Sequence, residues 1–135
     1  MKVLVDTPIW SLALRRRNRT ADDATTAELA SLIQDGRAAL IGAVRQELLS
    51  GIRERIHFER VRDHLRAFAD LEATRDDYEQ AASFFNVCRT KGIQGSNTDF
   101  LICAMAARIG FSIFTTDADF THFARLLPVT LHRAA

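Results

Sequence analysis

Two aspartates follow an apolar run late in the chain, where Ile113–Phe120 reads IFTTDADF and places Asp117 and Asp119 after two threonines. Near the N-terminus, the apolar run Lys2–Val5 also ends in an acid, Asp6. If these runs are neighbouring parallel strands, their carboxyl ends lie at one crevice, and so do Asp6 and Asp117. Carboxylates gathered in one place repel one another, and their hard oxygens suit Mg²⁺ or Mn²⁺.

Two further acids could point to the same place. Glu47, in the sequence RQELLSG, lies beside the apolar stripe of an expected helix. A helix glutamate is ordinarily solvated, but an acid beside an inward stripe is less common, because an unpaired buried carboxylate is costly. Asp99 follows Ser96 with capping-box spacing, so capping alone could explain both residues. It does not explain Asn97 and Thr98, which bring more polar groups to the same helix start.

Strands and helices are expected to alternate along the chain. The expected strands are Lys2–Val5, Ala38–Ile41, Leu71–Ala73, Phe111–Thr115 and Val129–His132. The expected helices are Trp10–Arg16, Asp22–Gln34, Val44–Ser50, Arg53–Ala69, Arg75–Lys91 and Asp99–Ile109. Strands that are apolar throughout and bounded by helices indicate an α/β fold with a parallel sheet covered on both faces.

Composition sets the class of protein. The chain has 135 residues, which we expect to form a single domain over 1–135, and its apolar fraction of 47% and charged fraction of 26% are typical of globular proteins. No apolar run approaches the roughly 18 residues of a membrane span, so we expect no membrane partner and a cytoplasmic location. Cys88 and Cys103 lie in apolar helical patterns and are expected to be buried, reduced thiols.

The chain resembles the PIN-domain ribonucleases, and most of all their toxin branch, the VapC toxins of type II toxin–antitoxin systems. The resemblance rests on the order and spacing of four segments: VDTPIW, RQELLSG, SNTDFLICA and IFTTDADF. The resemblance extends to about Phe123 and so covers nearly the whole chain. It implies a PIN-like α/β/α sandwich around a central parallel sheet of about five strands. It also implies a metal-dependent endoribonuclease whose products carry 5′-phosphate and 3′-hydroxyl ends.

The resemblance assigns roles to the acids. Asp6, Glu47, Asp99 and Asp117 match the catalytic acids, and Asp119 matches a supplementary one. Asp6 and Asp99 are expected to hold the principal ion, Mg²⁺ or in its place Mn²⁺. Asp117 would complete that site directly or through water. Glu47 and Asp119 would bind a second ion or orient water.

Polar residues beside these acids also match the family. Thr7 and Thr116 match small hydroxyl positions, and Asn97 matches a polar position next to Asp99. An acidic pocket repels RNA, so positive charge is expected around it. The cluster Arg15, Arg16, Arg17 and Arg19 could hold RNA phosphates at the rim, could meet an acidic partner, or could be a solvated loop.

The resemblance also implies partners. These toxins pair with an antitoxin that blocks the acidic pocket, often with a basic side chain, and they tend to form homodimers and toxin–antitoxin hetero-oligomers. On the helix expected over 53–69, the apolar residues Ile56, Val61, Leu65 and Phe68 are expected to pack in the core. Phe58 and Trp10 lie off the clearest apolar stripes and are candidates for a partner groove.

Two other classes of function remain. A phosphatase or phosphotransfer domain of the haloacid-dehalogenase or receiver type also places aspartates at strand ends, but Asp6 is followed by Thr-Pro-Ile rather than by a DxDx[TV] motif. The lysine expected downstream in those folds is missing, since Lys2 and Lys91 are the only lysines. The second class is a non-catalytic RNA-binding or assembly module that keeps the fold. Metal-dependent cleavage would distinguish a nuclease from this module, and a stable acyl-phosphate on Asp6 would favour phosphotransfer.

Overall fold

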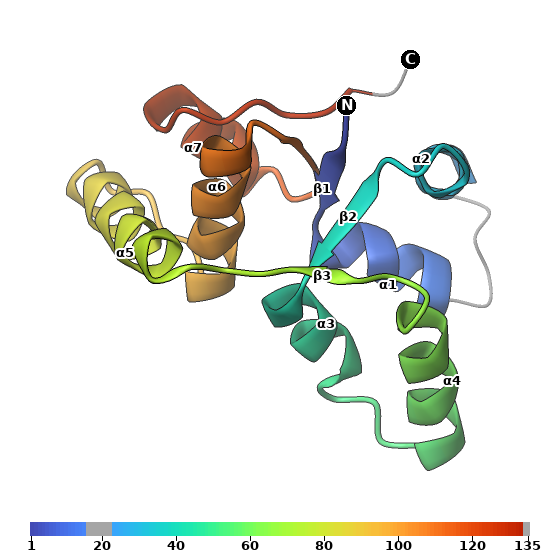
Figure 1. The fold of residues 1–135 in the computed structure, drawn as a ribbon. Coiled ribbons are helices and arrows are strands. Elements are labelled where there is room, and N and C mark those ends of the chain that lie inside the picture. The colour runs from blue at the N-terminus through green and yellow to red at the C-terminus, as the bar shows by residue number, and fades with distance from the viewer. Residues whose placement is uncertain (16–22, 134–135) are drawn as a thin grey trace.

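The computed structural model describes residues 1–15 and 23–133 (Figure 1). Its strands are β1 (Val3–Val5), β2 (Ala38–Ile41), β3 (Asp70–Leu71) and β4 (Ser112–Phe114). Its helices are α1 (Thr7–Arg15), α2 (Asp23–Gln34), α3 (Gly42–Leu49), α4 (Arg55–Leu65), α5 (Arg75–Thr90), α6 (Asn97–Ile109) and α7 (Asp119–Leu126). No helix within these residues is both long enough and apolar enough to cross a membrane.

The sheet is parallel and has the order β3-β2-β1-β4. Leu4 of β1 lies opposite Ala39 on one side and Ile113 on the other. All three residues of β1 are fully buried, which is why this strand is apolar throughout. β1 and β4 are neighbours, which meets the condition under which Asp6 and Asp117 fall at one crevice, and both strands end at the same edge of the sheet.

The prediction of about five strands was wrong, because the sheet of the described residues has four. Val129–His132 does not form the fifth strand but touches β4 through one isolated parallel bridge, between Ile113 and Leu131. Two backbone hydrogen bonds hold it there: Ile113 donates to Thr130 at 2.9 Å and His132 donates to Ile113 at 2.7 Å.

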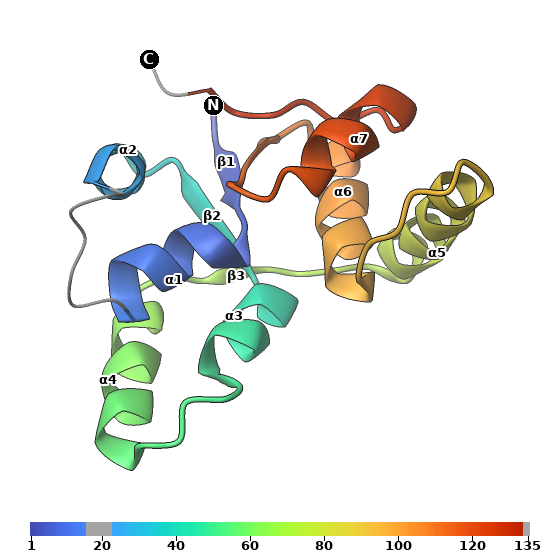
Figure 2. The same ribbon diagram turned by 180° about the vertical axis from the view of Figure 1, so that it is seen from behind.

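The helices form two layers around the sheet, as expected for an α/β/α sandwich. Figures 1 and 2 show α5, α6 and α7 on one side of the strands, with α1, α2 and α4 on the other. α3 follows the end of β2 and lies at the edge where the strands end. α6 is the most enclosed helix, with every residue from Phe100 to Ala106 buried. It ends at Gly110, whose φ of 83° is the left-handed conformation that suits glycine at a helix end.

Several element bounds differ from the prediction. α1 begins at Thr7 rather than at Trp10, because the carbonyl of Asp6 already accepts from the backbone N–H of Ile9 at 3.2 Å. α4 is shorter than the predicted 53–69 helix, and its turn at 66–68 leads into β3, which starts one residue earlier than expected. α7 was not predicted. It is short, and it is held on the core by Phe120 and Phe123.

Two predictions about apolar side chains were wrong. Trp10 is not on a partner surface: it is 1% exposed, donates its indole N–H to the carbonyl of Val5 at 3.2 Å, and packs edge-on against Phe68. Ile56 is not in the core, since it is 63% exposed. It lies five residues before the buried Val61, which places it roughly 140° away around the helix.

Both cysteines, Cys88 and Cys103, are buried and free as predicted.

Candidate active site

Asp6 is the most deeply buried acid at the edge where the strands end. Its side chain is 3% exposed. One carboxylate oxygen accepts from the backbone N–H of Thr7 at 2.8 Å, and the other accepts from the hydroxyl of Thr115 at 2.8 Å. Burial raises the pKa of Asp6 from 3.8 to about 6, because the charged form loses hydration, although both hydrogen bonds act in the opposite direction.

Glu47 reaches the same edge from α3. Its carboxylate accepts a hydrogen bond of 2.6 Å from the hydroxyl of Thr7, the residue next to Asp6. The Glu47 side chain is exposed, which agrees with a solvated helix glutamate. It is nevertheless held in one place by Thr7. α3 and the end of β1 are joined at this contact.

Asp99 begins α6 and forms the predicted capping box. The backbone N–H of Ser96 donates to one Asp99 carboxylate oxygen at 3.0 Å, and the backbone N–H of Asp99 donates to the Ser96 hydroxyl at 3.1 Å. The capping box is not the only influence on the Asp99 carboxylate. Burial, followed by the negative charges of Asp117 and Glu47, raises the pKa of Asp99 above its ordinary value. Asp99 therefore faces the other acids while it caps α6.

Asp117 lies three residues past the end of β4. Its backbone N–H donates to the hydroxyl of Thr115 at 3.0 Å, and its carboxylate accepts from the backbone N–H of Asp119 at 2.9 Å. The charges of Asp99 and Asp117 both act to raise the pKa of Asp6. Asp119 is exposed at the start of α7, and within the described residues no contact joins its carboxylate to the other acids.

The structure thus brings Asp6, Asp99 and Asp117 within electrostatic range of one another, and Glu47 within range of Asp99. They do not form a closed cage: in residues 1–15 and 23–133, no three Asp, Glu, His or Cys side chains converge into a ready-made metal centre. In each acid, one or both carboxylate oxygens accept a hydrogen bond from another group of the protein. Such an all-oxygen set fits a hydrated Mg²⁺, which keeps several waters and takes one or two carboxylates directly.

The polar residues predicted beside the acids are placed differently from one another. Thr7 contacts Glu47 through its hydroxyl and Asp6 through its backbone N–H. Thr116 is exposed, and the hydroxyl that joins Asp6 and Asp117 belongs to Thr115 instead. Thr115 was not predicted, although its position directly after an apolar strand was a usable signal. Asn97 is exposed at the start of α6, away from the described contacts of the acids.

A cavity of about 510 Å³ adjoins the acids and is lined by Thr7, Glu47, Thr98 and neighbours on α3. Thr98 and Ala43 also line a second cavity of about 410 Å³, into which Asn97 and Tyr78 project from α6 and α5. The two cavities share Ala43 and Thr98 in their linings, and together we call them the α3 groove. Tyr78, at 59% exposed, is the largest exposed side chain along it.

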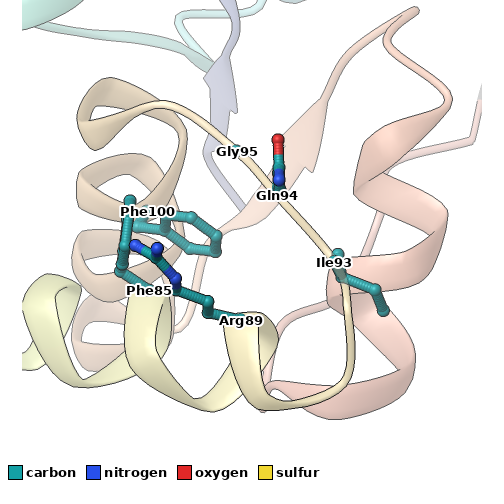
Figure 3. Close-up of a pocket in the computed structure, with 6 residues that line it drawn as sticks. All are labelled: Phe85, Arg89, Ile93, Gln94, Gly95 and Phe100. Carbon is teal, nitrogen blue, oxygen red and sulfur yellow. The ribbon is translucent and has the colours of Figure 1, made fainter.

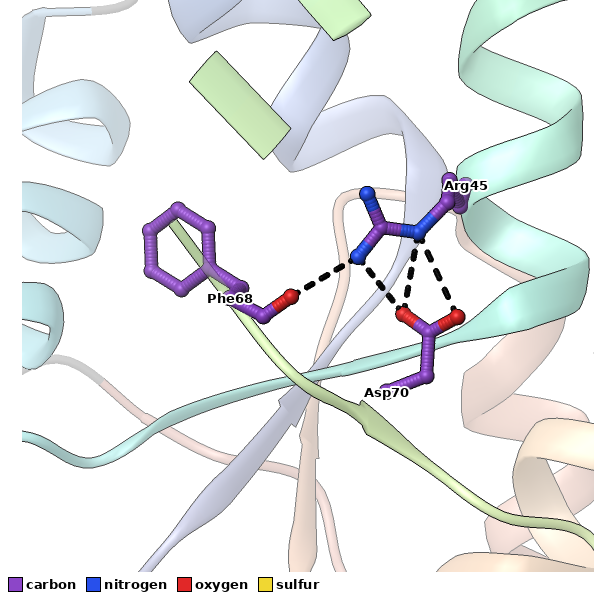
Figure 4. A network of polar contacts seen from close by, with 3 residues as sticks. All are labelled: Arg45, Phe68 and Asp70. Carbon is purple, nitrogen blue, oxygen red and sulfur yellow. Dashed lines mark hydrogen bonds and ion pairs between the residues drawn. The ribbon is translucent and has the colours of Figure 1, made fainter. Parts of the chain in front are cut away.

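The position of α3 depends on a polar anchor at the sheet edge (Figure 4). Arg45 donates to the Asp70 carboxylate at 2.7 and 3.0 Å and to the carbonyl of Phe68 at 2.9 Å. These contacts tie α3 to β3 and to the turn before it. Because Glu47 lies two residues after Arg45 on the same helix, the anchor also limits where Glu47 can lie.

The predicted basic cluster lies outside the part of the chain whose side chains the structure describes. Arg16, Arg17 and Arg19 lie outside the described residues, as does the side chain of Arg15, whose backbone ends α1. Other arginines pair with a nearby acid on the surface: Arg62 of α4 and Arg66, just after it, both pair with Asp63, at 3.1 and 4.0 Å.

Comparisons with known proteins agree with this geometry. Three solved structures share the fold. VapBC2 from Rickettsia felis bound to a DNA fragment from their promoter matches with a TM-score of 0.77 and 18% identity, over 98% of each chain. FitAcB from Neisseria gonorrhoeae matches with a TM-score of 0.75 and 20% identity, over 96% of each chain. A toxin–antitoxin complex from Klebsiella pneumoniae matches with a TM-score of 0.61 and 20% identity, over 88% of this chain and 90% of that one.

The comparison with curated proteins gave no significant match. The family model described as PIN domain matches residues 3–126, a range that runs from β1 to the end of α7 and includes all five predicted acids. The parallel sheet and the acids at the strand ends are consistent with this match, and the chain belongs to the PIN domain family.

Proposed function

We propose that this PIN domain is the toxin of a type II toxin–antitoxin system and acts as a metal-dependent endoribonuclease. The observation that carries the proposal is the meeting of Asp6, Asp99 and Asp117 at neighbouring strand and helix ends, where burial and the charges of Asp99 and Asp117 raise the pKa of Asp6. A buried carboxylate such as Asp6, with two further carboxylates beside it and no cationic side chain bonded to them within the described residues, is costly unless a cation binds. If these acids only stabilised the fold, nothing would explain why the protein keeps a buried carboxylate at this cost in free energy.

Mg²⁺, with Mn²⁺ as a substitute, is the proposed cofactor, and Asp6 and Asp99 are the residues that would hold it, with Asp117 close by. Hard oxygen donors and room for water match the preferences of these ions. When bound, the ion would supply an activated water and neutralise charge on the leaving oxygen of the phosphodiester. The number of ions depends on whether Glu47 binds one or only orients water.

The chain's own residues have separate tasks in this proposal. Thr115 and the Thr7 backbone N–H hold the Asp6 carboxylate in one orientation, so it does not rotate away when substrate arrives. Ser96 does the same for Asp99. Glu47, exposed and held by Thr7, is positioned to accept a proton from water at its free carboxylate oxygen. Asp119 lies outside this set and would act only through water.

The proposed partners follow from the family and the neighbours. Two of the three structural neighbours are described as VapBC2 bound to promoter DNA and as a toxin–antitoxin complex, which supports an antitoxin as partner for this chain. A VapB-like antitoxin would block the acids with a basic side chain, and the α3 groove, rimmed by Glu47, suits such a segment. We further propose a homodimer, a toxin–antitoxin hetero-oligomer and action in the cytoplasm, where RNA is the substrate.

The test is cleavage of end-labelled total RNA by the purified protein without antitoxin. Reactions contain Mg²⁺, Mn²⁺ or EDTA, and an Asp6→Asn, Asp99→Asn double variant runs beside the wild type. We expect discrete cuts that need metal and disappear in the double variant. Absence of metal-dependent cleavage across the whole pool, from folded protein, would refute the nuclease and favour a non-catalytic RNA-binding or assembly module.

A further inference from the structure

A further hollow lies beside the segment that leads into α6 (Figure 3). It has a volume of about 230 Å³ and is bounded by the end of α5, the loop after it and the first turn of α6. We call it the loop pocket. Its lining consists of Phe85, Arg89, Ile93, Gln94, Gly95 and Phe100. It is smaller than the roughly 300 Å³ at which pockets for drug-sized molecules begin, so it suits a single ring.

The floor of the loop pocket is aromatic and rigid. Phe85 and Phe100 pack edge to face with ring centroids 5.5 Å apart, and Phe100 packs in turn on Phe123 at 4.9 Å. Phe100 is 1% exposed, while Phe85 is only half-buried and offers part of its ring to the pocket. The loop lies close to this floor at Gly95, where a Cβ would come within 2.6 Å of Phe123.

The charge of the loop pocket is opposite to that of the acidic site. Among the described residues that line it, Arg89 is the charged one, and no carboxylate is present. Arg89 is exposed and forms no ion pair with any carboxylate in the described part of the chain. By contrast, Glu47 lines the cavity beside the acids. Asp70 and Glu72 line another cavity next to β3. An exposed arginine with no carboxylate among the lining residues favours an anionic ligand group at the loop pocket.

The loop pocket and the acids share one segment of chain. Gly95 lines the pocket, and the next residue, Ser96, donates its backbone N–H to the Asp99 carboxylate at 3.0 Å. A ligand chain that crosses the acids therefore needs to extend only past this segment to reach Phe85 and Arg89. Gln94, exposed at the rim, adds an amide that can both donate and accept hydrogen bonds.

We propose that the loop pocket holds one unstacked base of a single-stranded RNA whose neighbouring phosphodiester lies at the acids. The base stacks against Phe85, the Arg89 guanidinium contacts a backbone phosphate, and Gln94 contacts the base edge. Aromatic rings, arginine planes and side-chain amides are the groups with which proteins bind unpaired RNA bases. The inference rests on the proposed function, since it names a part of the substrate site of the same nuclease.

The test measures RNA binding rather than cleavage, so that it can fail separately from the nuclease. A short fluorescein-labelled single-stranded RNA of randomised sequence is titrated with the protein in EDTA, and anisotropy gives the affinity. Phe85→Leu keeps an apolar side chain of similar size on the packed floor but removes the ring, and we expect about tenfold weaker binding. Arg89→Gln should lower the slope of log affinity against log salt by about 0.7.

The matched controls lie on the same helix but outside the loop pocket. Val87→Ala, at a side chain that is 42% exposed, and Arg75→Gln, at the far end of α5, should leave the affinity unchanged. A second readout is ultraviolet crosslinking of an RNA that contains 4-thiouridine, followed by peptide mapping. We expect the crosslink within the peptide that contains Phe85 and Arg89.

The outcomes separate the two proposals. RNA binding that weakens in Phe85→Leu and Arg89→Gln supports the loop pocket even if no cleavage is found, in which case the nuclease alone fails. Unchanged affinity in both variants, with crosslinks elsewhere and with cleavage intact, overturns the loop pocket, leaves the nuclease standing and points to a partner's side chain as the occupant. Wild-type protein that binds no RNA overturns the loop pocket as well.

Discussion

Thr115 donates its hydroxyl hydrogen to Asp6 across 2.8 Å, from the end of β4 to the end of β1. The two residues are 109 positions apart in the chain. The same hydroxyl oxygen accepts from the backbone N–H of Asp117 at 3.0 Å, so a single side chain sets the distance between two acids. Because Asp6 is 3% exposed, this bond is one of the few that compensate for its lost hydration.

The first prediction concerns Thr115→Val, which keeps the volume and removes the hydroxyl. The hydrogen bond lowers the pKa of Asp6, so its loss raises that pKa above about 6. A hydrogen bond to a charged group contributes about 1.5 kcal/mol or more, which is about one pH unit. The acid limb of the cleavage rate should therefore move to higher pH by about that amount. Thr116→Val, at the exposed neighbour, is the matched control, and equal profiles for the two variants would contradict the assignment.

The second prediction is that Asp6→Asn stabilises the metal-free protein at neutral pH. The folded-state pKa of Asp6 is raised from 3.8 to about 6, so its contribution to stability is fully present below about pH 4 and is lost as the pH rises through 6. A shift of about two units corresponds to about 3 kcal/mol, which the asparagine does not lose. Urea unfolding in EDTA should show the variants diverging between about pH 4 and 6.

Its control is Asp76→Asn, at an exposed position on α5. That variant measures the effect of an Asp→Asn change at a position away from the acids. Addition of Mg²⁺ should then stabilise the wild type more than Asp6→Asn, because ligand binding adds stability only where the site is intact. A gap between wild type and Asp6→Asn that does not change with pH would show that Asp6 is not strained by burial.

The third prediction concerns Gly95→Ala. An added Cβ would lie 2.6 Å from Phe123 and 3.0 Å from Phe100, both of which are packed in the core. Overpacking of this kind costs about 1–3 kcal/mol. The loop would shift outward and move Ser96, which orients Asp99, so cleavage should fall along with stability. Urea unfolding and cleavage are measured together. Val87→Ala is the control, and a variant as stable and active as wild type would show that the loop adapts freely.

The fourth prediction concerns the anchor of α3. Arg45→Met keeps the length of the side chain but removes the bonds to Asp70 and to the Phe68 carbonyl. The pair is partly exposed, so we expect a stability loss of only about 1 kcal/mol. Cleavage should fall more than this loss explains, because α3 carries Glu47. Arg53→Met, at an exposed position before α4, is the control. Activity equal to wild type would show that Glu47 needs no anchor.

Local features of the structure were predictable from the sequence. The burial of Val3–Val5 follows from an uninterrupted apolar run, and the capping box of Ser96 and Asp99 follows from their spacing. Both depend on residues that are neighbours in the chain, where geometry is nearly fixed. The same holds for the helix end at Gly110, which needs the left-handed conformation.

Features that depend on distant contacts were not predictable in this way. Which of two adjacent threonines faces Asp6 is set by the backbone path after β4, and the prediction of Thr116 was wrong because Thr115 is the one that donates to Asp6. Trp10 is buried, although it lies off the helix stripe, because Phe68 from a later segment covers it. Ile56 is exposed because α4 turns Val61 and Leu65 inward instead.

The sequence by itself determined that acids stand at the ends of apolar strands and at the start of a capped helix. Only the tertiary structure decided that β4 lies next to β1, and that Asp99 and Glu47 face the same edge. The physical reason is the range of the forces involved. Apolar runs and caps act over a few residues, whereas the raised pKa of Asp6 sums burial and charges brought together from β1, α6 and the segment after β4.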